Sequence, residues 1–66
     1  MAKVSDATKE QLAGLGYALK THPNGWLSWT NQRLGAKSVN KWRDENQAWL
    51  AVQRSAEVRG IFPIKT

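Results

Sequence analysis

The absence of cysteine in so short a chain limits most strongly what this protein can fold into. The chain has 66 residues and no cysteine, so disulfides and thiolate metal sites are excluded. A domain of this size buries only about 60% of the surface that its unfolded chain exposes. Stability must therefore come from dense packing or from a second subunit. Dense packing is feasible because the four tryptophans can each bury roughly 150–250 Å².

The spacing of apolar residues predicts a single all-α domain, a three-helix fold over residues 1–66. The first helix is expected to begin at a cap formed by Ser5-Asp6 or Thr8. It is expected to end by His22, because Pro23 disfavours helical geometry in the residue before it. The apolar face of this helix comprises Leu12, Leu15 and Leu19.

Two glycines weaken the prediction of the first helix. Gly14 and Gly16 each lower helix stability by about 1 kcal/mol relative to alanine. Close approach of another helix would explain both, and a break after Ala13 is the alternative. The turn signal Pro23-Asn24-Gly25 also favours a hairpin, but the stretch 13–21 does not alternate like a strand, so we expect a loop between helices. His22, in that loop, is expected to be an ordinary exposed histidine.

The second helix is expected over Trp26–Leu34 and the third over Val39–Arg59. Gly35 supplies the permissive backbone that ends helices, and Ser38 can cap the helix that follows. Arg59 in the last turn and Gly60 after it form a stop signal. The predicted apolar face of the third helix comprises Val39, Trp42, Trp49, Leu50 or Val52, and Ala56.

The tryptophans are expected to serve mainly as core residues. Trp42 and Trp49 are one heptad apart and fit one buried stripe, whereas Trp26 and Trp29 flank a loop and can be partly exposed. The chain closes with an apolar tail of Ile61, Phe62 and Ile64. In a monomer this tail would fold back over the helices, and in a dimer it could exchange with a neighbour.

Charge is concentrated in one part of the chain. Between Gln11 and Arg43 there is no carboxylate, and the remaining basic residues are balanced by the acids elsewhere, so the net charge of +5 belongs to this window. Such a concentration attracts polyanions such as nucleic acid. The alternative is a solvated lysine surface that aids solubility. The basic residues of the window are Lys20, Arg33, Lys37, Lys41 and Arg43.

Several classes of function lack the residues they need. A nucleophile would need an activating base, and the one histidine lies in a turn beside a proline; Asp44-Glu45 would point about 100° apart on a helix. There is no phosphate-binding glycine loop, so we expect neither an enzyme nor a bound cofactor or metal. No apolar run approaches the ~20 residues of a membrane span. With no export signal, a cytoplasmic protein is expected, in the host cytoplasm if a phage encodes it.

The stretch Trp26–Arg43 resembles the helix-turn-helix of small phage and plasmid regulators. The matching features are a glycine turn at Leu34-Gly35-Ala36, with Val39 and Trp42 facing inward beyond it. In that family the second helix enters the major groove of DNA. The resemblance therefore implies a DNA-binding transcriptional or recombination regulator that contacts duplex DNA through the turn at 34–37 and the start of the third helix.

The chemistry of the window suits such a role. Asn40 can pair with adenine, and Arg43 or Lys41 with guanine, whereas Arg33 and Lys37 can hold phosphates. A homodimer is the expected assembly. The alternative is an inhibitor or adaptor that docks on a protein partner through exposed tryptophans and the IFPI tail; membrane-surface binding is a weaker third reading. The predicted DNA-binding residues are Arg33, Lys37, Ser38, Asn40, Lys41 and Arg43.

Overall fold

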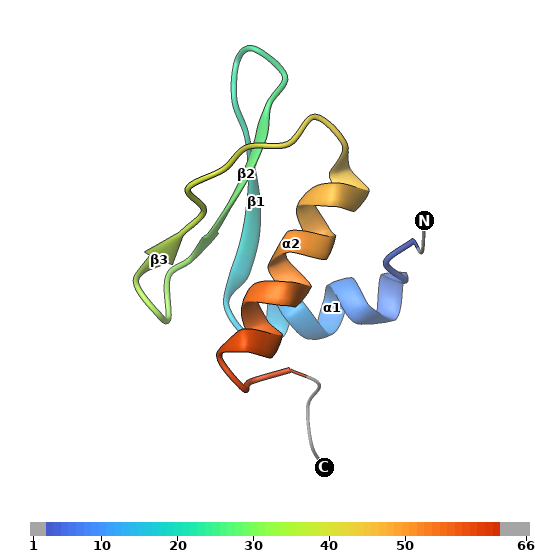
Figure 1. The fold of residues 1–66 in the computed structure, drawn as a ribbon, viewed down its shortest axis with the longest axis vertical. Helices are drawn as coiled ribbons and strands as arrows, with labels where there is room; N and C mark the ends of the chain where they lie inside the picture. The colour runs from blue at the N-terminus through green and yellow to red at the C-terminus, as the bar shows by residue number, and fades with distance from the viewer. Residues whose placement is uncertain (1–2, 63–66) are drawn as a thin grey trace.

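The computed structural model describes residues 3–62 and shows a small sheet covered by helices (Figure 1). The strands form one antiparallel sheet in the order β1-β2-β3. The predicted all-α three-helix domain is therefore wrong, because residues 17–37 form three strands and the turns between them rather than helices. The elements in chain order are α1 (Asp6–Gly14), β1 (Tyr17–Thr21), β2 (Leu27–Asn31), β3 (Ala36–Lys37) and α2 (Glu45–Val58).

Helix α1 begins where the sequence predicted and ends earlier. The Ser5 hydroxyl accepts a hydrogen bond from the Thr8 backbone N–H at 3.2 Å, which confirms Ser5 as the cap. The helix ends at Gly14 and does not continue to His22, so the expected long first helix is wrong and the alternative break after Ala13 is close to the actual end. Gly16 then turns the chain into β1 with φ +104°, a conformation that L residues rarely adopt.

Strands β1 and β2 form a hairpin, although a loop between two helices was expected here. Tyr17 pairs with Asn31 and Thr21 with Leu27, and the backbone N–H of His22 donates to the Trp26 carbonyl at 2.8 Å to close the turn. The alternation was hidden because the stretch 13–21 includes the end of α1. Residues 17–21 alone alternate buried or half-buried and exposed side chains up to Lys20, as a half-buried strand does.

The third strand is interrupted by a bulge where the third helix was expected to start. Thr30 pairs with Lys37, so regular pairing would place Asn40 opposite Leu27, but Trp42 is bonded there instead. The chain therefore has two extra residues between these pairs, and the segment 39–41 loops out after Ser38, which is still bonded to Trp29. As a result Val39, predicted to be core, is 97% exposed.

Helix α2 is shorter than predicted at its start and correct at its end. Its cap is Asp44, whose Oδ1 accepts from the Asn46 backbone N–H at 3.1 Å, and Ser38 does not cap a helix. The helix ends at Val58 with Arg59 as its C-cap, and Gly60 follows at φ +75°, which confirms the stop signal.

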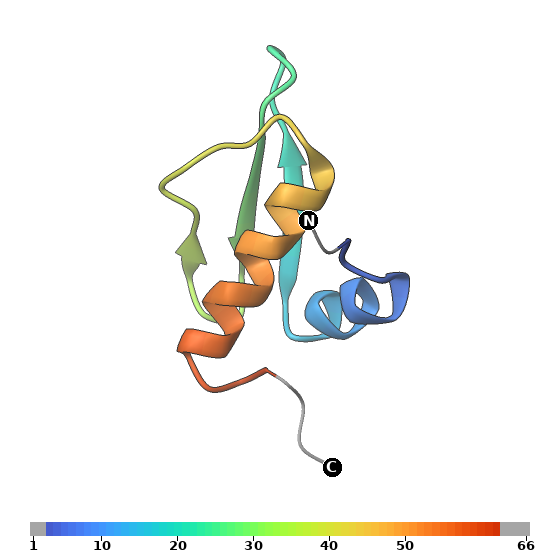
Figure 2. The same cartoon turned by 45° about the vertical axis from the view of Figure 1, so that its right-hand side comes forward.

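Both helices pack on one face of the sheet (Figures 1 and 2). The inner face carries Tyr17 and Trp29, whose rings meet edge to face at 5.3 Å between centroids. Val52 and Ala56, predicted as core, are fully buried against them. The half-buried side chains that pack on this core include Leu19, Trp42, Trp49, Ile61 and Phe62.

Ile61 and Phe62 lie against the core, as predicted for a monomer, whereas Ile64 lies outside the described residues. His22, expected to be exposed, is half-buried, and its Nε2 lies 2.8 Å from the Ser28 hydroxyl.

Candidate nucleic-acid interface

The face of the sheet opposite the helices is open and basic. Thr30 on the central strand pairs with Ala18 on one side and with Lys37 on the other, so these three side chains share the outer face. Lys20 and Ser28, which pair two residues along the strands, point to the same face because side chains alternate. Lys20 and Lys37 are exposed, on the two outer strands. Thr30 lies between them on the central strand and is half-buried.

An arginine and a tryptophan extend this face toward the β1–β2 turn. Trp26 precedes β2 and lies on the same side as Ser28, because Leu27 between them faces inward. The Arg43 guanidinium lies over the Trp26 ring, 4.5 Å from its centroid. Two backbone hydrogen bonds between Leu27 and Trp42, of 2.6 and 2.8 Å, hold the neighbouring residues together. We call the set Lys20, Trp26, Thr30, Lys37 and Arg43 the basic face; Ser28 lies on the same side of the sheet but is buried, so it is not part of this set.

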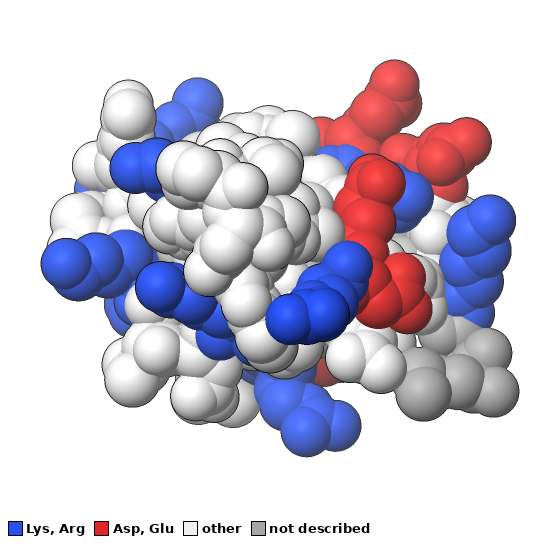
Figure 3. Space-filling view, turned by 90° about the horizontal axis from the view of Figure 1, so that it is seen from above, with Lys and Arg blue, Asp and Glu red and all other residues white. Residues whose placement is uncertain are grey.

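Acidic residues are confined to the helical side of the molecule. Asp6 and Glu10 lie in α1, Asp44 caps α2, and Glu45 and Glu57 lie in α2. Figure 3 shows most of the acidic side chains gathered over one side and only basic ones on the opposite side.

The cations of the basic face are not neutralised by nearby carboxylates. Within residues 3–62 the only ion pairs are those of Lys9, with Asp6 at 4.0 Å and with Glu45 at 3.8 Å, on the helical side. Lys20, Lys37 and Arg43 therefore present uncompensated charge on one face.

The six residues predicted to bind DNA do not form one recognition surface. Lys37 and Arg43 belong to the basic face, and Lys41 is exposed in the bulge beside it. Arg33 lies in the β2–β3 turn, where its Nη1 donates to the Gly14 carbonyl at 2.9 Å and so caps the end of α1.

The other two predicted residues lie at the boundary between sheet and α2. Ser38 is bonded to Trp29 through its backbone N–H at 2.9 Å and through its hydroxyl, which accepts from the Trp29 N–H at 3.1 Å. Asn40 is exposed in the bulge. The helix that was expected to align these residues is absent from 38–43, so the helix-turn-helix geometry implied by the resemblance does not form.

Three members of the basic face were not among the DNA-binding residues predicted from the sequence. Lys20, Trp26 and Thr30 were placed in or beside helices, so their common face was not visible. The pattern Leu27-Ser28-Trp29-Thr30-Asn31 carries the missed signal, because large or amide side chains alternate with small hydroxyl ones.

Other kinds of site find little support in the described part of the chain. Over residues 3–62 no group of three or more His, Cys, Asp or Glu side chains is placed to hold a metal ion. Among the same residues no helix has the length and apolarity needed to cross a membrane. Comparison of the chain with protein-family models, curated proteins and solved structures found no match.

Proposed function

We propose that the protein binds duplex DNA through its basic face. The observation that carries the proposal is the separation of charge, since every acid lies on the helices or at their caps and the open sheet face carries cations alone. A surface of one sign attracts a polyanion and releases its counterions on binding.

The dimensions of the sheet suit a groove of duplex DNA. Lys20 and Lys37 lie on strands separated by two strand spacings, about 10 Å. The major groove is about 12 Å wide and admits a two-stranded β-ribbon as well as a helix. Lysines on the two outer strands can therefore contact the two phosphate backbones, while Thr30 between them faces the base edges.

A titration of a fluorescent random duplex at two salt concentrations tests this proposal. The log-log slope of affinity against salt should be about −0.9 per phosphate contacted. Lys20→Glu and Lys37→Glu should each weaken binding. Lys3→Glu changes the charge equally and serves as the control, because Lys3 is exposed beside the start of α1 and away from the sheet.

Two outcomes would contradict the proposal. The first is an absence of binding even at low salt. The second is an equal loss of affinity in Lys3→Glu and Lys37→Glu, which would show that net charge matters and the basic face does not.

A further inference from the structure

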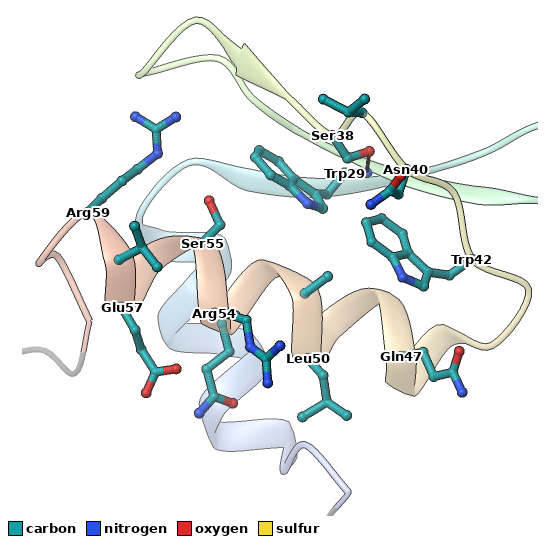
Figure 4. A pocket seen from close by; sticks show the side chains of 14 residues that line it. Trp29, Ser38, Asn40, Trp42, Gln47, Leu50, Arg54, Ser55, Glu57 and Arg59 are labelled. Atoms are coloured by element: carbon teal, nitrogen blue, oxygen red, sulfur yellow. Dashed lines mark hydrogen bonds between the residues drawn. The ribbon is translucent and has the colours of Figure 1, made fainter.

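A groove of about 910 Å³ runs between α2 and the segment that follows β3. In Figure 4 the indoles of Trp29 and Trp42 point from the sheet side toward α2, and Ser55 points back toward them from the helix. Both tryptophans lie on the inner side of the sheet, opposite to Thr30 and Lys37. The groove is therefore a separate surface from the basic face.

Exposed apolar side chains stand at this groove. Val39 from the bulge and Val58 from the last turn of α2 both line it and are 97% and 83% exposed. Across residues 3–62, they and Leu34 are the large apolar side chains that the fold leaves exposed. Two exposed valines beside the half-buried indole of Trp42 are typical of an interaction surface.

The charge of the groove indicates what kind of partner it fits. Arg54 and Arg59 line it together with one acid, Glu57. In the described part of the chain neither arginine forms an ion pair with a carboxylate. A partner that supplies carboxylates would satisfy both arginines at the edge of an apolar contact.

We propose that this groove binds an amphipathic helix of a partner protein, with apolar side chains on one face and carboxylates beside them. The apolar side chains would pack between α2 and the half-buried indole of Trp42, with the buried Trp29 as part of the lining, and the carboxylates would lie near Arg54 and Arg59. The groove is lined from Gln47 in α2 to the C-cap residue Arg59, a length of about 18 Å at 1.5 Å per residue. A helix of about three turns matches that length, and helix-in-groove binding is a common mode of recognition.

The probe is a synthetic helical peptide with leucines on one face and glutamates at the edges of that face. Its control has the same leucines with lysine in place of every glutamate. Binding is followed by two-dimensional NMR of the protein labelled with ¹⁵N, in which each tryptophan indole N–H gives its own signal. The glutamate peptide should shift the signals of Trp29 and Trp42 saturably and leave that of Trp26 in place, and the lysine peptide should bind more weakly.

Charge reversal distinguishes the groove from general attraction. The double variant Arg54→Glu/Arg59→Glu should weaken the glutamate peptide by at least about fivefold. Both side chains are exposed, so the variant should keep the parent circular dichroism spectrum. Lys20→Glu/Lys37→Glu, on the basic face, should leave the peptide affinity unchanged, so failure of the DNA proposal would not affect this test.

The proposal is overturned if the peptide shifts the Trp26 signal rather than those of Trp29 and Trp42. It is also overturned if the arginine reversal has no effect, or if neither peptide binds at millimolar concentration. The arginine double variant could also lose as much random-duplex binding as Lys20→Glu/Lys37→Glu. That result would assign the groove to nucleic acid and would likewise overturn the proposal.

Discussion

The side-chain oxygen of Asn31 occupies the space that a β-carbon on Gly16 would need. An alanine methyl group at residue 16 would lie 2.7 Å from Asn31 Oδ1, closer than real contacts allow. Asn31 is only 1% exposed; its Nδ2 donates to the Leu15 carbonyl at 3.4 Å, and its Oδ1 accepts from the Leu34 N–H at 3.2 Å. One amide therefore joins the turn before β1 to the turn after β2.

Gly16→Ala should destabilise the protein by about 1–3 kcal/mol, because it combines the contact with Asn31 and a backbone φ of +104°. Gly14→Ala is the matched control, since nothing lies within 4 Å of the added β-carbon and the residue is helical. Urea unfolding measures both free energies. Equal stability of the two variants would show that the turn adapts to a side chain at residue 16.

Leu12→Ala and Leu34→Ala make the same chemical change in two environments. Leu12 is fully buried in the core and its truncation should cost about 2–5 kcal/mol, whereas Leu34 is 42% exposed and should cost less than about 1 kcal/mol. Thermal and urea unfolding both report the difference. A similar cost at the two positions would mean that the β2–β3 turn covers Leu34 in solution.

Asp44→Ala should lower stability by about 1 kcal/mol, because it removes the oxygen that accepts from the Asn46 N–H at the start of α2. Asp44→Asn keeps an accepting oxygen and should stay close to the parent protein. The free energy of unfolding in urea, compared for both variants, gives the result. If the asparagine variant proved as unstable as the alanine variant, the charge of the carboxylate rather than its hydrogen bond would be the stabilising feature.

The pair of Trp26 and Arg43 should act as a unit in DNA binding, provided that the basic face is the binding surface. Trp26→Leu and Arg43→Ala should each weaken duplex binding, and the double variant should be no weaker than Arg43→Ala. The expected coupling is about 0.5–1 kcal/mol, the usual strength of an exposed cation–π contact. Trp26→Phe keeps an aromatic ring and should retain most of the affinity. Fully additive losses would show that the indole does not orient the guanidinium.

The ends of the fold were easier to predict from the sequence than its centre, because the central strands are short. Ser5 and Gly60 act through local backbone chemistry, so the start of α1 and the end of α2 were predictable. Trp26, Trp29 and Leu34 fit a helical spacing, but of the three only Trp29 lies in a strand and faces the helices. Five residues are too few to separate a period of 2 from one of 3.6.

The sequence predicted where the positive charge is concentrated, but not which of the basic side chains share a face. The acid-free window from Gln11 to Arg43 becomes the sheet with its turns and the bulge, which is why the cations share a side of the molecule. Which of them share a face depends on strand register, set by pairs such as Thr30 with Lys37. Register depends on contacts between distant residues, and the spacing of residues along one strand does not contain it.

The bulge after β3 also determines where residues can be inserted into or deleted from this chain. Its two extra residues leave the alternation of side chains in phase, so Trp42 still points toward α2 and Arg43 still reaches the opposite face. The pairing of Trp42 with Leu27 fixes these directions, and a shift of that pairing by one residue would turn the indole to solvent and the guanidinium into the core. The loop around Asn40 should therefore tolerate insertions or deletions that leave this pair in place, and a change that shifts the pair by one residue should be as damaging as the loss of a core side chain.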